Sequence, residues 1–258
     1  MISRALIFAL VGTIGLAAAA SVRADDNVRD VQSKLSDQGF YFGQIDGAYS
    51  SDLSAALSRY QIRNGLPITG QLDAETSKTL GAKSAIRPST AGSEQGSETW
   101  RRLRKGEPRT SAKAPETCSP RTNEANTGPS PQSPEFSSER LRDYVAAFVL
   151  AGLDKSVGAE TEFFADRVEY YDSGTMDREK IREDLKRYDE RWPERHFWVA
   201  GAIDIEPQSE NRVRVSFPLG FKLRNGSKQS SGKVDKALVL ESAGDDLQIV
   251  AVNERKAD

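Results

Sequence analysis

Cysteine and histidine are almost absent from this chain. Its 258 residues include one cysteine, Cys118, and one histidine, His196. A single cysteine cannot close an internal disulfide, so Cys118 is either a free thiol or a bridge between two chains. The His and Cys spacings that bind zinc are missing, and Ser-His-Asp chemistry would depend on His196 alone. We therefore expect no metal site and no cofactor.

A strong charge of either sign is also lacking. The formal net charge is −2, because 36 Lys and Arg residues stand against 38 Asp and Glu residues. Nucleic-acid-binding domains usually present a basic surface, so we expect no nucleic acid as a partner. Hydrophobic residues make up only 37% of the chain and charged residues 29%. This polar composition indicates that part of the chain does not fold.

A long hydrophobic run occurs once, over residues 5–20, and it is too short to span a bilayer comfortably. Arg4 precedes it, and small residues around Ala24 lead into the polar Asp25. This order is typical of a cleaved signal peptide. We expect residues 1–24 to be removed on export to the periplasm or cell wall, without stable membrane insertion afterwards. The alternative is an uncleaved N-terminal anchor.

Proline is concentrated in residues 83–135, which hold seven of the 11 prolines and show no apolar periodicity. Such a segment buries too little surface to offset its ordering entropy. We expect a disordered linker there, between a small domain at 25–82 and a larger one at 136–256. The basic stretch Trp100–Lys105 is either a contact for anionic lipid or wall polymer, or a solvated run of charge.

Residues 25–82 show the periodicity of three short helices. Apolar residues recur on one face over 28–38, 51–63 and 74–80. Gly39 lies where a helix C-terminal cap belongs. A module this small needs nearly all of its large apolar residues for its core. We predict an all-α three-helix module.

Many positions of this module also follow one recurring pattern: Leu35, Gly39-Phe40-Tyr41, Gly43, Ile45-Asp46-Gly47, Tyr49, Leu53, Ala56, Tyr60-Gln61, Gly65-Leu66, Thr69-Gly70, Leu72-Asp73, Thr76 and Leu80. The segment resembles the three-helix peptidoglycan-binding domain, which occurs at the ends of many wall hydrolases and secreted envelope proteins. The resemblance implies peptidoglycan as a partner. Ser50-Ser51 departs from the family pattern, so docking to proteins instead of sugar is an alternative.

Peptidoglycan offers sugar faces, amides, hydroxyls and carboxylates. Flat aromatic rings and fixed hydrogen-bonding groups suit such a ligand. The residues of these types near the turn and the end of the second helix are our candidate ligand contacts: Tyr41, Asp46, Tyr49, Gln61 and Asn64. For each of them a purely structural role is the alternative, such as a turn cap for Asp46.

Residues 136–256 begin with helical periodicity and continue with strand alternation. Helices are predicted over 137–152, near 157–164 and over 178–191, and four alternating runs follow, two of them joined at Asn225-Gly226. This order predicts an α+β domain with a curved antiparallel sheet wrapped on helices. The whole chain is thus multidomain.

The segments VEYYDSG and DREKIREDLKRYDERWPERHFWV, with the closing strands, resemble the nuclear-transport-factor-like cone fold, also found in SnoaL-like proteins. That fold hosts enzymes, binders and assembly modules, and it implies a homodimer through the open sheet. We expect a non-catalytic ligand-binding or dimerisation domain. The alternative is a wall-targeted enzyme with Asp172 as general base, unless Asp172 only caps its turn. The expected pocket lining is Tyr144, Phe148, Tyr170, Asp172, Trp198 and Phe217.

Overall fold

The computed structural model describes most of both predicted modules, over residues 25–82, 92–106, 136–154, 156 and 158–257. The expected signal peptide, Cys118 and most of the expected linker lie outside the described residues. Within the described part of the chain, no helix combines the length and hydrophobicity needed to cross a membrane.

The N-terminal module consists of α1 (Asp26–Asp37), α2 (Ser51–Arg63) and α3 (Ala74–Leu80), which confirms the predicted three-helix unit. Each helix begins at a side-chain cap, because the side chains of Asp25, Ser50 and Asp73 accept backbone N–H bonds there. One apolar cluster closes the module: Val28, Val31, Leu35, Tyr41, Leu53, Ala56, Leu57, Tyr60, Leu72 and Leu80.

A helix interrupts the expected linker. This helix, α4 (Gly92–Lys105), buries Trp100 and Leu103 almost completely. The Trp100 indole N–H donates to Asp154 at 2.8 Å, and Arg104 pairs with Asp246 at 2.6 Å. Neither a lipid contact nor a solvated run of charge describes this stretch. Its two buried apolar residues are too few to give a periodic signal, so the helix depends on its partners in the larger module.

The C-terminal module contains two long helices and a seven-stranded sheet. The strand order is β2-β1-β7-β6-β5-β3, and β4 pairs with β5. The elements are α5 (Ser138–Ala151), η2 (Ala159–Phe163), β1 (Phe164–Tyr170), η3 (Tyr171–Ser173), β2 (Thr175–Asp177), α6 (Arg178–Arg191), β3 (Glu194–Val199), β4 (Asp204–Ser209), β5 (Arg212–Asn225), β6 (Lys228–Ala243) and β7 (Asp246–Lys256).

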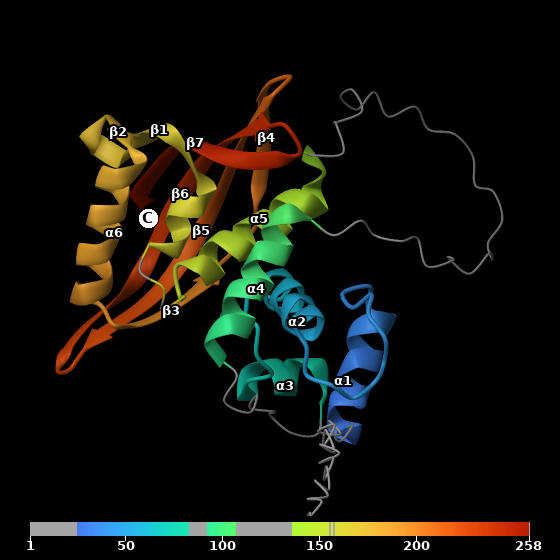
Figure 1. Ribbon diagram of the computed structural model, residues 1–258. Helices are drawn as coiled ribbons and strands as arrows, with labels where there is room; N and C mark the ends of the chain where they lie inside the picture. The colour runs from blue at the N-terminus through green and yellow to red at the C-terminus, as the bar shows by residue number, and fades with distance from the viewer. Residues whose placement is uncertain (1–24, 83–91, 107–135, 155, 157, 258) are drawn as a thin grey trace, which may run out of the picture.

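This architecture confirms the predicted α+β domain with helices packed on a curved sheet (Figure 1). Two details differ from the prediction. The sheet is mixed, because β1 runs parallel to β7 while the other neighbours are antiparallel. The short helix near 157–164 is a 3₁₀ turn that follows Gly158, whose φ of 75° ordinary residues rarely adopt.

The two modules share a core, although the sequence suggested a flexible tether between them. Ala55, Ile62 and Ile68 of the small module belong to the same apolar cluster as the cone domain. The Ile68 N–H donates to the Phe197 carbonyl at 3.1 Å, which extends the edge of β3. Figure 1 shows α2 beside α4 and α5, with α1 farther from the sheet.

Buried charge also links the modules. Arg59 on α2 bonds to Asp143 on α5 at 3.0 Å, and both side chains are less than one tenth exposed. Such a pair requires close geometry because both charges lose their hydration. The small module is therefore docked on the cone domain.

Candidate functional site

A buried glutamine organises the first turn of the small module. The Gln32 side-chain amide lies within hydrogen-bond distance of Tyr41 Oη (3.2 Å) and Asp46 Oδ1 (2.9 Å), and its oxygen accepts from the Gly47 N–H at 2.8 Å. The hydrogen bond from Gln32 holds the pKa of Asp46 below its usual value. Tyr41 is buried and donates to the Gln44 carbonyl at 2.7 Å. Tyr41 and Asp46 thus meet on Gln32.

A second buried glutamine organises the following loop. Gln61 is fully buried, and its side-chain nitrogen, with two N–H groups, lies 2.8–3.0 Å from three acceptors, Thr69 Oγ1, the Gln71 carbonyl and Thr76 Oγ1. Its side-chain oxygen accepts from the backbone N–H groups of Thr69 and Gly70. For Gln61 these internal bonds favour the structural alternative over a ligand contact.

The five predicted contact residues therefore fall into separate groups. Tyr49 donates to the Gly70 carbonyl at 3.0 Å and so joins Gln61 at the loop, apart from the Tyr41 and Asp46 pair. Asn64 caps the end of α2, with its side-chain amide donating to the Tyr60 carbonyl at 2.8 Å. The five residues are not gathered at one contact point, and their role as ligand contacts stays a prediction.

The exposed apolar residues of this turn escaped the sequence reasoning. Phe42 is 41% exposed and Ile45 is 46% exposed, next to the buried Tyr41. The Arg59 guanidinium lies 5.8 Å from the centre of the Phe42 ring. The run Phe40-Tyr41-Phe42 signals an aromatic turn, but it has no period that shows which ring faces outward. Ile45, which the small size of the module assigned to the core, is at the surface.

The cone domain encloses an open pocket of about 460 Å³ between α5, α6 and the sheet. This volume is in the range of small-molecule sites. Phe148 and Tyr170 line the pocket as predicted, together with six other aromatic residues: Phe164, Tyr171, Tyr188, Trp192, Phe197 and Phe221.

Four residues of the expected lining lie elsewhere. Tyr144 and Phe217 are in the packed core, and the Tyr144 hydroxyl donates to the Leu247 carbonyl at 3.0 Å. Trp198 lines a separate hollow of about 420 Å³ at the seam with the small module. Asp172 is exposed and outside the pocket, because the turn that follows β1 carries it away from the interior.

A buried amine and its partners occupy one wall of the pocket. Lys236 Nζ lies 3.0 Å from the Tyr171 hydroxyl and 2.9 Å from a Glu254 oxygen. Burial alone would lower the pKa of Lys236, but the interactions with Tyr171 and Glu254 outweigh it and raise the pKa. Tyr171 adopts a φ of 49°, a strained conformation for a bulky residue, and such strain clusters at functional sites.

Glu160 is a buried carboxyl group that also lines the pocket. It is 8% exposed, and burial raises its pKa to about 7. Gly152 leaves room for it, since a Cβ there would lie 3.1 Å from Glu160 Oε1. Nearby, the Tyr170 hydroxyl donates to Asp184 at 3.2 Å. Sequence reasoning missed Glu160 because only the tertiary fold buries it.

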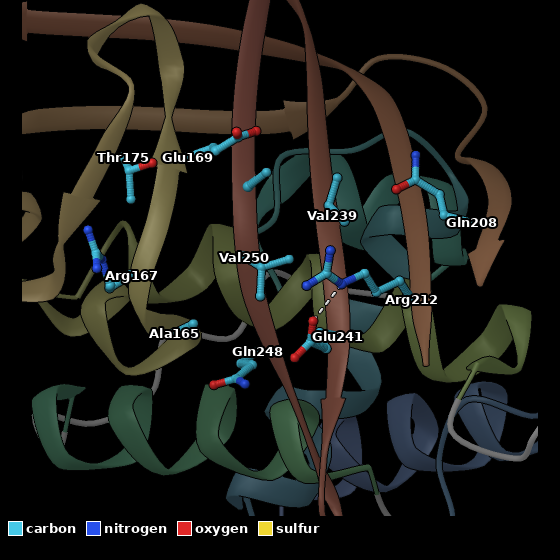
Figure 2. Close-up of a pocket in the computed structure, with 11 residues that line it drawn as sticks. Ala165, Arg167, Glu169, Thr175, Gln208, Arg212, Val239, Glu241, Gln248 and Val250 are labelled. Carbon is cyan, nitrogen blue, oxygen red and sulfur yellow. Dashed lines mark hydrogen bonds and ion pairs between the residues drawn. The ribbon is translucent and has the colours of Figure 1, made fainter. Parts of the chain in front are cut away.

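The outer face of the sheet carries a second hollow, of about 490 Å³. Figure 2 shows Arg212 beside Glu241, with 2.5 Å between Arg212 Nε and Glu241 Oε2. Arg167 and Glu169 of β1 and the apolar Val239 of β6 line the same hollow. This surface is shallow and presents both signs of charge.

Comparison with known proteins supports the N-terminal resemblance. Residues 24–80 match the family described as "Putative peptidoglycan binding domain". The chain is also 43% identical over 70 residues to the localization factor PodJL of Caulobacter vibrioides, in two strains. That stretch is 27% of this chain but 7% of those relatives. The three-helix segment is thus similar to a peptidoglycan-binding domain.

Solved structures resemble the C-terminal part. Aln2 from a Streptomyces species is 13% identical, covers 48% of this chain and 92% of its own, and has a TM-score of 0.42. A nuclear transport factor 2-like protein from Salmonella enterica is 15% identical over 42% of this chain and 82% of its own, with a TM-score of 0.36. An NTF2-like protein with a cystatin-like fold from Novosphingobium aromaticivorans is 12% identical over 46% of this chain and 80% of its own, with a TM-score of 0.37.

Proposed function

We propose that this protein is an exported, non-catalytic envelope protein that binds peptidoglycan through residues 24–80 and holds a small molecule in its cone pocket. The family match of the small module carries the first half of this proposal. The open pocket of about 460 Å³, rather than a closed core, supports the second half. Because the modules share a core, the two proposed sites would lie on one body.

The exposed turn of the small module is the surface that we assign to the wall. Phe42 and Ile45 offer apolar contact to sugar faces, and Asp46 adjoins them with a carboxylate that is exposed. The cone domain packs on α2 through Ala55 and Ile62 and pairs with Arg59, which lies beside the Phe42 ring. Phe42 and Ile45 nevertheless remain exposed in the docked protein, so this turn stays accessible.

Sedimentation with purified sacculi tests the wall half of the proposal. We expect residues 25–258 to pellet with sacculi in a saturable manner, and the Phe42→Ser/Ile45→Ser variant to bind about tenfold more weakly, because it loses apolar contact area. Glu183→Gln, an exposed change on α6, should bind like the parent protein. A parent protein that stays in the supernatant at low salt would refute peptidoglycan binding.

Asp172, the general base of the alternative enzyme hypothesis, does not lie in the pocket. Asp172 is exposed and does not line the pocket, so it is not placed to act as a base on a bound molecule. We therefore propose that the pocket binds a molecule without converting it.

We also propose that two copies pair through the outer face of the sheet. Val239, Val250 and Ala251 supply an apolar centre, and residues of both charges surround it, so that this face can pair with its own copy about a twofold axis. Analytical ultracentrifugation of residues 25–258 should show a dimer that Val239→Lys disrupts. A parent protein that remains monomeric across the micromolar range would remove this part.

A further inference from the structure

We infer that the cone pocket selects a cationic ligand, a small organic amine with an aromatic or apolar body, and that Glu160 is the group that binds the amine. This inference rests on the proposed function of the pocket as a small-molecule site. It adds the chemical class of the ligand and the residue that determines it.

The balance of charges in the pocket carries the inference. Three carboxyl groups line it, Glu160, Asp184 and Glu254, against a single amino group, Lys236. Lys236 is matched by Glu254 at 2.9 Å. Asp184 is matched by Arg187, at 3.1 Å. Of these four lining groups, Glu160 alone forms no ion pair with the described residues. A cation on a ligand would give Glu160 the partner that the other groups already have.

The neighbours of Glu160 do not supply that cation. Arg195 is the nearby base, and it pairs with Asp189. Asp154 and Asp189 both face Glu160 with negative charge, and Tyr170 lies close on β1. A buried carboxylate with acidic neighbours is costly without a partner. An ammonium group at this point would lower that cost.

The rest of the pocket suits the body of such a ligand. Eight aromatic side chains form its walls. Aromatic faces attract cations, and their area accommodates an apolar body. An anionic ligand would instead be repelled by Glu160, and Lys236 would offset this little because it already pairs with Glu254. Shape and charge therefore favour the same class of molecule.

Three probes of nearly equal shape test the inference by isothermal titration calorimetry on residues 25–258: naphthylmethylamine, naphthalenemethanol and naphthoate. Near pH 8 we expect the amine to bind at least about tenfold more tightly than the alcohol, with naphthoate the weakest. Glu160→Gln should abolish the preference of the amine over the alcohol. Glu183→Gln, the same change at an exposed position, should leave the preference intact.

The pH dependence of the parent protein gives a second readout if Glu160→Gln does not fold. Because burial raises the pKa of Glu160 to about 7, the preference for the amine should disappear near pH 5.5, where the carboxyl is protonated. The inference is overturned if the alcohol or naphthoate binds as tightly as the amine, if none of the three binds, or if the preference survives protonation. Tight binding of naphthoate would reject the preference for amines but would still support the pocket as a small-molecule site. Sedimentation with sacculi tests wall binding independently.

Discussion

Two buried residues, Gln61 and Glu160, have opposite roles in this protein. Gln61 has both side-chain groups bonded within the small module, whereas Glu160 has a carboxyl that forms no ion pair with the described residues. A satisfied buried amide stabilises a loop, and an unmatched buried carboxyl adds a cost that a ligand can relieve. We therefore expect Gln61 to contribute to stability and Glu160 to make stability depend on pH.

Replacing Gln61 by alanine should lower the free energy of unfolding by about 3 kcal/mol, because several buried donors and acceptors lose their partner. Chemical denaturation of residues 25–258 measures this change. Gln44→Ala is the matched control, since Gln44 is exposed, and it should cost less than about 0.5 kcal/mol. Equal, small effects of both substitutions would show that Gln61 does not hold the Thr69–Gly70 loop.

Glu160 should make stability fall as pH rises. Its pKa is about 7 in the folded protein against 4.5 without the fold, so between these values the folded state retains a proton that the unfolded state has lost. Stability is then lost with rising pH through this window, by about 3 kcal/mol in total. Unfolding curves of parent protein and Glu160→Gln, compared at pH values below and above the window, isolate this effect. If the free energy of unfolding of the parent protein and of Glu160→Gln changes equally with pH, the prediction is wrong.

At the scale of helices, the contact between α2 and α5 joins the modules through one buried and one exposed ion pair. Arg59 and Asp143 are buried, whereas Arg63 and Glu139, at 3.5 Å, are about half exposed. Removing one partner of a buried pair leaves an uncompensated charge, and an exposed pair contributes little because water and salt screen it. The exposed pair is therefore a control for substitutions in the buried pair of the same two helices.

Arg59→Met should destabilise the protein by about 3 kcal/mol, and Arg63→Met by less than about 1 kcal/mol. Adding Asp143→Leu to Arg59→Met should restore most of the loss, because two apolar side chains can replace a buried pair. Thermal and urea unfolding of the four proteins give the comparison. If Arg59→Met leaves the free energy of unfolding unchanged, the buried pair between the docked modules does not contribute to stability.

The sequence predicted the elements whose signals are local. The helices predicted over 51–63, 74–80 and 178–191 are α2, α3 and α6, and Ser50, Asp73 and Asp177 cap their first turns. It did not predict α4, because Trp100 and Leu103 are buried only by residues distant in the chain. For the same reason the outward ring of the turn is Phe42 rather than Tyr41, and the buried acid of the pocket is Glu160 rather than Asp172.

At the scale of the whole molecule, docking of the modules determines which surfaces are available. One face of α2 is covered by α4 and α5, and the turn with Phe42 and Ile45 is open. The cone pocket opens in the other module and has its own lining. Wall binding and ligand binding should therefore occur together, without separation of the modules.

Hydrogen exchange of residues 25–258, free and bound to sacculi, is the decisive measurement of wall binding by the docked modules. New protection should appear in residues 40–48, and the amides of α2 that lie against α4 and α5 should remain as protected as in the free protein. Exchange that increases along α2 on binding would mean that the modules separate to reach the wall. Unchanged exchange in residues 40–48 of sacculus-bound protein would place the contact elsewhere and contradict the central claim.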